Sequence, residues 1–186
     1  MSILNAIKWK LVIPKLSRIK LLVLAVDGVL PDGGLFYTSN GDVIKRFDVK
    51  DGLGIKLLQE SGIEVVFLSG GLGGSTELRA SHLKIKKCFF NVKDKSSTLR
   101  ELQQELGISK DNTCYVGDDL NDLVVKSFVK FFIVSNNAPI ELKRLATCTL
   151  KNSGGYGAIR EISDKILKSK NLLDNYYKNG WINNNI

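Results

Sequence analysis

The sequence predicts a single α/β domain built on a doubly wound parallel sheet. Short, continuously apolar segments alternate with longer segments in which apolar residues recur every three or four positions. The short runs are typical of strands buried on both faces, and the periodic segments are typical of the helices that connect them. Polar residues lie just beyond the ends of three of the apolar runs, at Asp27, Ser69 and Asp118. Because ligands bind beyond the carboxyl ends of such strands, these residues also predict where the site lies.

The individual elements follow from this alternation together with turn and cap residues. Five apolar runs predict strands, at Leu21–Val26, Glu64–Leu68, Lys87–Asn91, Thr113–Val116 and Phe131–Val134. The periodic segments predict helices, at residues 51–61, 75–83, 95–106, 138–146 and 157–168. We expect Asp51 to cap the first helix, because its carboxylate can accept a backbone N–H there. Gly107 is expected to end the third, because glycine readily adopts the left-handed conformation after a helix.

A β-hairpin is expected between the first strand and the first helix. Gly34–Tyr37 and Val43–Phe47 flank Ser39-Asn40-Gly41, and Asn-Gly between two such segments is a strong hairpin signal. We therefore divide the chain into a basic extension at residues 1–18, a domain at 19–170 and a C-terminal tail at 171–186.

Composition narrows the classes of function. The chain has 186 residues and a net charge of +8, and no apolar stretch approaches the roughly 20 residues of a membrane span. Lysines interrupt the N-terminal apolar residues, so no signal peptide is expected, and we predict a cytoplasmic protein without a membrane partner. The lysines are dispersed and not interleaved with aromatic residues, so we expect no nucleic-acid partner. Three cysteines that are far apart in the sequence predict neither a zinc site nor a disulfide framework.

Three loops and one lysine suggest chemistry on a phosphate group. Phosphoryl transfer needs a nucleophile in line with phosphorus and positive charge on the other oxygens, and Mg²⁺ held by hard oxygens supplies much of that charge. The Mg²⁺ ligands would be the carboxylate of Asp118 and the backbone carbonyl of Asp27, with Asp119 and Asp122 supporting the metal from the same loop. Phosphate oxygens would be bound by Ser69 and the amide of Gly70, and Lys95 would offset charge. Taken singly, each of these features also fits an ordinary turn or a surface lysine.

In combination, these residues resemble the four motifs of the haloacid dehalogenase (HAD) superfamily. A closer resemblance, over residues 19–170, is to the capless phosphatases typified by 3-deoxy-D-manno-octulosonate 8-phosphate (KDO 8-phosphate) phosphatase. The matching segments are 26–30 with 32–33, 45–47, 51–55, 61–65, 93–95, 115–120 and 154–161.

The resemblance implies a Rossmann-like HAD fold with a β-hairpin flap in place of a cap domain. It also implies Mg²⁺ as cofactor, a small sugar-acid phosphate as substrate, and Asp27 as the acid/base. Family members form tetramers, which here would place residues 34–47 between subunits. Gly154–Arg160 either presents Arg160 near the site, where it would bind substrate or phosphate, or is a glycine-rich turn into the last helix.

Four positions depart from the family pattern, at Ala25, Pro31, Gly71 and Gly73. The resemblance places a nucleophilic aspartate at position 25, and a methyl group has no lone pair with which to attack phosphorus. Loss of a nucleophile costs on the order of 10⁵–10⁶ in rate. An engineered change explains Ala25 alone, whereas natural loss explains all four departures, and we favour natural loss. We expect a phosphatase whose activity is lost or strongly impaired; the alternative is a non-catalytic oligomeric module that binds a ligand or partner of sugar-acid biosynthesis.

Overall fold

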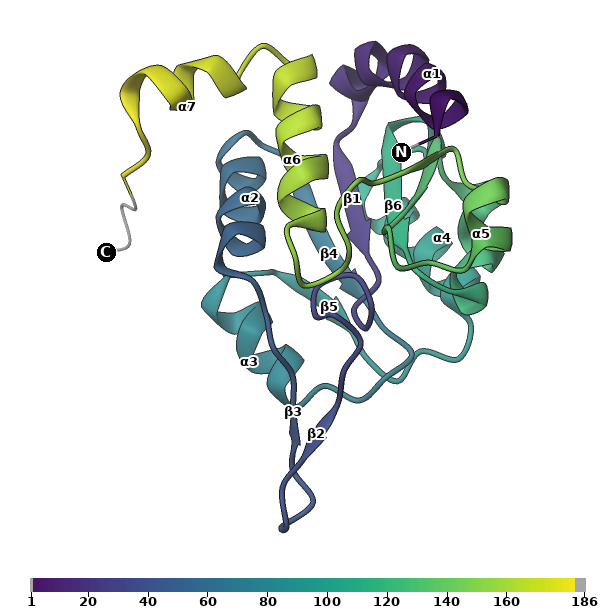
Figure 1. The fold of residues 1–186 in the computed structure, drawn as a ribbon, viewed down its shortest axis with the longest axis vertical. Helices are drawn as coiled ribbons and strands as arrows, with labels where there is room; N and C mark the ends of the chain where they lie inside the picture. The colour runs from purple at the N-terminus through teal and green to yellow at the C-terminus, as the bar shows by residue number, and fades with distance from the viewer. Residues whose placement is uncertain (1, 183–186) are drawn as a thin grey trace.

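The computed structural model describes residues 2–182 and confirms the parallel α/β sheet. Six strands lie in the order β5-β4-β1-β6-β7-β8, and every pairing between neighbours is parallel. The strands are β1 (Leu21–Leu24), β4 (Glu64–Leu68), β5 (Lys87–Phe89), β6 (Thr113–Gly117), β7 (Phe131–Val134) and β8 (Cys148–Thr149). A separate two-stranded hairpin, β2 (Phe36–Tyr37) and β3 (Val43–Ile44), extends from one end of the molecule (Figure 1).

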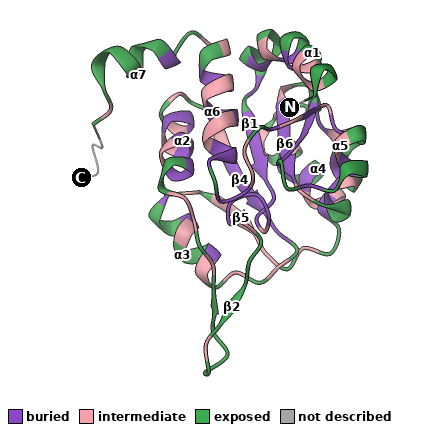
Figure 2. Cartoon of the chain, in the orientation of Figure 1, coloured by how far each residue is buried: buried purple, intermediate pink, exposed green. Residues whose placement is uncertain are grey.

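Helices cover both faces of the sheet. Figure 1 shows α2 and α6 in front of the sheet and α4 behind it. The helices are α1 (Ile3–Val12), α2 (Val49–Glu60), α3 (Ser75–His82), α4 (Lys95–Leu106), α5 (Ile140–Leu145), α6 (Ala158–Ser169) and α7 (Leu173–Asn179). Shorter 3₁₀ segments are η1 (Ile13–Arg18), η2 (Lys110–Asn112) and η3 (Leu120–Phe128). The central strands are buried, whereas the hairpin is exposed (Figure 2).

The register of the strands places Asp27, Ser69 and Asp118 at the same edge of the sheet. Leu24 of β1 lies opposite Phe67 of β4 and Val116 of β6. Asp27, Ser69 and Asp118 therefore follow aligned positions on neighbouring parallel strands. The structure confirms that these three residues follow neighbouring strands at one edge of the sheet, and that they form a ligand site stays a prediction.

The helix after the hairpin is capped by a different aspartate from the one predicted. Helix α2 begins at Val49 because the carboxylate of Asp48 accepts the Lys50 N–H at 2.7 Å, so the assignment of the cap to Asp51 is wrong. Asp51 lies within the first turn, and its Oδ1 accepts the backbone N–H of Arg160 at 2.7 Å. Arg160 is in the first turn of α6, so this carboxylate joins the N-termini of the two helices. Burial raises the pKa of Asp51 to about 6.

Asp51 is expected to make stability depend on pH. The folded-state pKa of about 6 exceeds the ordinary value of 3.8, so the folded state binds the proton more tightly. Stability should fall as pH rises from about 4 to about 6, by on the order of 3 kcal/mol. Asp51→Asn keeps an oxygen for the Arg160 N–H and should remove this loss. Urea unfolding across that pH range tests the effect, with the exposed Asp174→Asn as control; equal pH profiles for Asp51→Asn and the unmodified chain would refute it.

Both ends of the described chain carry helices that the sequence analysis did not predict. Helix α1 buries Trp9 and Val12 in the same core as the sheet, so the predicted extension at residues 1–18 packs against the domain. In the predicted tail, α7 buries Leu173, and the indole N–H of Trp181 donates to the carboxylate of Glu60. The last four residues of that tail lie outside the described part. Across residues 2–182, none of the helices combines the length and hydrophobicity needed to cross a membrane.

Candidate active site

Asp118 lies against the turn that follows β1. Gly28 has φ +73°, and a Cβ there would overlap the Asp118 carboxylate, so only glycine permits this approach. The Gly28 carbonyl accepts hydrogen bonds from Ser135 Oγ at 3.1 Å and Asn137 Nδ2 at 2.9 Å. Burial and then the neighbouring carboxylates Asp122 and Asp119 raise the pKa of Asp118 to about 7. This crowding of negative charge is what a bound cation would relieve.

Asp122 is a buried support behind Asp118. Its side chain is fully inaccessible, and Oδ1 accepts from Lys95 Nζ and from Tyr115 Oη, both at 2.6 Å. Its Oδ2 accepts the Asp118 N–H at 2.9 Å and fixes the turn after β6. Asp119 caps η3 through the Leu120 N–H at 2.7 Å. The structure thus places Asp122 and Lys95 beneath the loop, as partners of each other, rather than at its open face.

Asp27 forms an ion pair with a lysine from the hairpin side. Lys45 Nζ lies 2.7 Å from Asp27 Oδ1, and the lysine side chain is almost completely buried. Lys45 also lies 3.5 Å from Thr76 Oγ1 in α3, which holds the ammonium between three elements. This pair places a positive charge directly beside the Asp27 carboxylate.

Ser69, Gly70 and Gly71 form the turn after β4. The hydroxyl oxygen of Ser69 accepts the Gly71 N–H at 3.0 Å, so Ser69 shapes the turn as well as lying at the site. A Cβ added at Gly71 would lie 3.0 Å from Asp27 Oδ2. A larger residue at position 71 would therefore crowd Asp27 in its present position. The glycine leaves room for Asp27 to pair with Lys45.

Arg46, which follows Lys45, holds the hairpin base to the last loop of the domain. Its guanidinium donates to the Gly155 carbonyl at 2.6 Å and lies 4.2 Å from the centre of the Tyr156 ring. Arg160 is directed elsewhere, since its Nε donates to Asp164 one turn further along α6 at 2.8 Å. Among the described contacts none joins the Arg160 side chain to Asp27, Ser69 or Asp118. Its substrate-binding role stays a prediction without support from this geometry.

Few side-chain carboxylates at this end of the sheet are available to act as metal ligands. Ala25 is buried at the end of β1 and provides no oxygen from its side chain. In the part of the chain that the structure describes, no group of three or more His, Cys, Asp or Glu residues is disposed to hold a metal ion. Asp122 is committed to Lys95 and Tyr115, and Asp27 to Lys45. The predicted Mg²⁺ ligands that remain without another partner among the described residues are the Asp118 carboxylate and the backbone carbonyl of Asp27, and their role stays a prediction.

Four contributing residues were not singled out from the sequence. Lys45 pairs with Asp27, Tyr115 holds Asp122, and Ser135 and Asn137 bind the Gly28 carbonyl. Lys45 and Tyr115 belong to segments that match the family, at 45–47 and 115–120, which was the available signal. Nothing in the local sequence indicates the roles of Ser135 and Asn137, because these depend on which strands are neighbours.

Comparison with known proteins identifies the family. A family model described as haloacid dehalogenase-like hydrolase matches residues 81–162. The 3-deoxy-D-manno-octulosonate 8-phosphate phosphatase KdsC of Haemophilus influenzae is 39% identical over 156 residues, which are 84% of this chain and 87% of the relative. The protein of that name from Escherichia coli K12 is 37% identical over 164 residues, or 88% of this chain and 87% of the relative.

Solved structures agree in fold and in sequence. The phosphatase from Moraxella catarrhalis, crystallised with magnesium, phosphate and KDO, superposes with a TM-score of 0.87 at 34% identity, covering 91% of this chain and 97% of that one. The cobalt-bound H. influenzae phosphatase gives 0.82 at 38% identity, covering 86% and 93%. On identity sustained over most of both chains, this chain belongs to the 3-deoxy-D-manno-octulosonate 8-phosphate phosphatase family of HAD-like hydrolases.

Proposed function

We propose that this chain retains the ligand site of a KDO 8-phosphate phosphatase but has lost most or all of the hydrolytic step. The observation that carries the proposal is Ala25, buried at the end of β1 where the family places its nucleophile. A methyl group cannot form the covalent phosphoryl intermediate of this chemistry. Next to this position, the Gly28 turn packs against Asp118, and Asp122 accepts the Asp118 N–H.

The remaining residues have separable roles in this proposal. The Ser69 hydroxyl and Gly70 amide bind phosphate oxygens, and Lys45 adds positive charge at the entrance. Asp27, which lies beside Lys45, donates a proton to the bridging oxygen of the ester and then, as a carboxylate, takes a proton from the attacking water. Mg²⁺, when bound, supplies charge neutralisation to the phosphate, and Asp118 holds it. With one carboxylate ligand missing, we expect Mg²⁺ binding in the millimolar range.

One incubation with two readouts tests this proposal. The chain is mixed with KDO 8-phosphate and Mg²⁺, and both bound substrate and released phosphate are measured. We expect intact substrate to be retained by the protein with phosphate at background. Release at rates typical of enzymes would refute the loss of hydrolysis. Absence of any binding would instead favour the second candidate, a module that keeps the fold for a protein partner.

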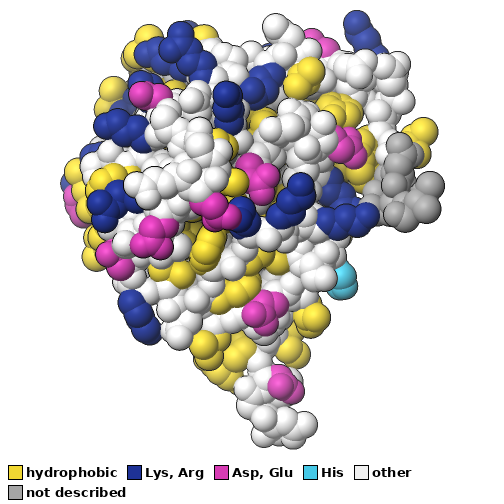
Figure 3. Space-filling model, turned by 180° about the vertical axis from the view of Figure 1, so that it is seen from behind, with side chains coloured by type: hydrophobic (Ala, Val, Ile, Leu, Met, Phe, Trp, Pro, Cys, Tyr) yellow, Lys and Arg dark blue, Asp and Glu magenta, His cyan; other side chains and the backbone are white. Residues whose placement is uncertain are grey.

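We further propose a homotetramer assembled through the hairpin. Large apolar side chains of the hairpin and α3 region are exposed, namely Leu35, Phe36, Tyr37, Ile44, Leu72 and Leu78. Figure 3 shows hydrophobic side chains gathered over this end of the molecule. An exposed apolar patch of this kind is typical of a protein interface.

Tyr37→Ser is expected to weaken that assembly. Tyr37 is 70% exposed in the single chain, and burial of such a ring in an interface is a large part of its stability. Light scattering after size-exclusion chromatography should show a smaller species. Tyr177→Ser is the matched control, because Tyr177 is 71% exposed on α7. Equal masses for the two variants would contradict the hairpin interface.

A further inference from the structure

Helix α1 has an outward face that is apolar where a surface helix is normally polar. Its inward side buries Trp9 and Val12. Its outward side carries Ile3, Leu4, Ile7 and Leu11, each at least half exposed. Surface helices of soluble domains usually present charged or polar residues to water. This face therefore lacks a partner within the described chain.

The helix is fixed in this orientation by the edge of the sheet. Asn5 Nδ2 donates to the Thr149 carbonyl at 2.8 Å, and the Thr149 N–H donates to Asn5 Oδ1 at 3.0 Å. The Trp9 indole N–H also donates to the Thr149 carbonyl, at 2.9 Å. These bonds close the free edge of β8 and hold α1 against it. Ile7 and Leu11 cannot turn inward without breaking them.

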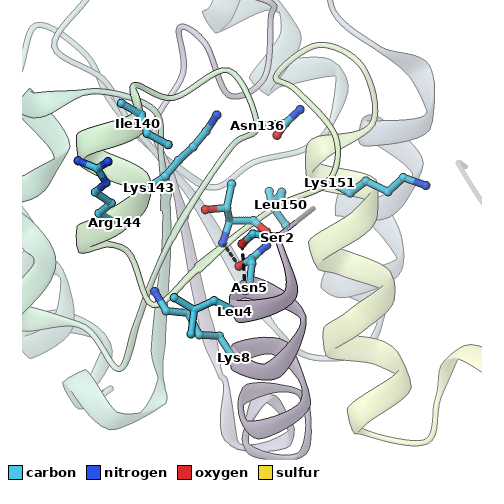
Figure 4. A pocket seen from close by; sticks show the side chains of 11 residues that line it. Ser2, Leu4, Asn5, Lys8, Asn136, Ile140, Lys143, Arg144, Leu150 and Lys151 are labelled. Carbon is cyan, nitrogen blue, oxygen red and sulfur yellow. Dashed lines mark hydrogen bonds between the residues drawn. The ribbon is translucent and has the colours of Figure 1, made fainter.

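Positive charge surrounds the apolar face. Residues 1–26 contain five Lys or Arg and no Asp or Glu. Beside α1 lies a pocket of about 490 Å³ between α1, α5 and the segment that follows β8. Its lining includes Lys8, Lys143, Arg144 and Lys151, of which Arg144 is paired with the exposed Glu141 at 2.9 Å. The apolar Leu4 and Ile140 also line the pocket (Figure 4).

We propose that α1 and this pocket dock on an anionic phospholipid surface. The apolar side chains enter the boundary between headgroups and acyl chains, and the surrounding lysines attract the phosphate groups. At ten residues α1 is too short to span a bilayer and would lie in its plane. The prediction of no membrane partner rests on the absence of a spanning segment. A helix that lies in the plane of the bilayer surface needs no such segment.

Charge argues against a second copy of the chain on this face. Symmetric packing of α1 on α1 would bring lysine-rich segments together with no carboxylate from the same segment to neutralise them. The hairpin lies at the opposite end of the molecule, so assembly through it leaves α1 accessible (Figure 1). A flat surface of negative charge matches a protruding helix of this composition.

Vesicle sedimentation tests the proposal. The full chain should sediment with vesicles of phosphatidylglycerol and phosphatidylcholine, should not sediment with phosphatidylcholine alone, and should dissociate as salt is raised. Ile7→Ser with Leu11→Ser should weaken binding roughly tenfold or more. Lys143→Gln should weaken it roughly fivefold. Val124→Ser, at a side chain 52% exposed on η3 against 51% for Ile7, should leave it unchanged.

Three results would overturn the proposal. The first is absence of sedimentation with either vesicle. The second is equal binding by the Ile7→Ser, Leu11→Ser chain and the unmodified chain. The third is a change in oligomeric mass in that double variant without lipid, which would make the face a contact between copies of the chain.

Discussion

Ala25→Asp is expected to raise phosphate release from KDO 8-phosphate by on the order of 10⁵. The substitution restores a carboxylate at the end of β1, within the frame that Gly28, Asp118 and Asp122 still form. That carboxylate would attack phosphorus as the ester oxygen leaves with the proton of Asp27, and water would then hydrolyse the acyl phosphate. Since Gly71 still lacks a side chain for the ligand, the gain should appear in kcat while KM stays high.

Ala25→Asn is the matched control for this substitution. It has the size and polarity of aspartate but is a poor nucleophile, so it should leave turnover at background. The aspartate variant should also bind Mg²⁺ more tightly by calorimetry, because a second carboxylate joins Asp118. Unchanged turnover in an Ala25→Asp chain that still binds substrate would contradict the proposal that the missing nucleophile at position 25 prevents hydrolysis.

Asp122→Ala is expected to destabilise the fold by about 3–5 kcal/mol. Its carboxylate is fully buried and accepts from Lys95 and Tyr115, so removal leaves an ammonium and a phenol without their partner. The Asp118 N–H loses its acceptor as well. Urea unfolding measures the loss directly.

Asp119→Ala is the control from the same loop. Asp119 is exposed and caps η3, so its replacement should cost only about 1 kcal/mol. Lys95→Met in the Asp122→Ala background should recover part of the stability, because it removes the unpaired buried charge. A cost for Asp122→Ala no greater than for Asp119→Ala would refute the supporting role of Asp122.

Much of the fold could be predicted because its signals are local. Helix α4 runs from Lys95 to Leu106 and ends at Gly107 with φ +63°, as its periodicity and glycine indicated. The cap of α2 was misplaced because two aspartates three residues apart both fit the local pattern. Asp51 is instead buried within the first turn, where it accepts the N–H of Arg160, which lies 109 positions away in the sequence.

The same limit applies to the site. Asp27 and Asp118 could be singled out as candidates because they lie just beyond the ends of buried strands. Lys45 was not, because its approach to Asp27 depends on how the hairpin folds back over the sheet. A role for Arg160 in the site was predicted from the glycine-rich segment before it. In the structure its side chain donates to Asp164 instead. Helix α1 was missed because apolar residues on both of its faces obscure the helical period.

The most direct test of the central claim is phosphate release by the unmodified chain, measured with KDO 8-phosphate and Mg²⁺ beside the Ala25→Asp variant. The unmodified chain should release phosphate at a rate that cannot be distinguished from that of the Ala25→Asn control. Only the aspartate variant should turn over the substrate. Turnover by the unmodified chain at a rate close to that of Ala25→Asp would contradict the claim.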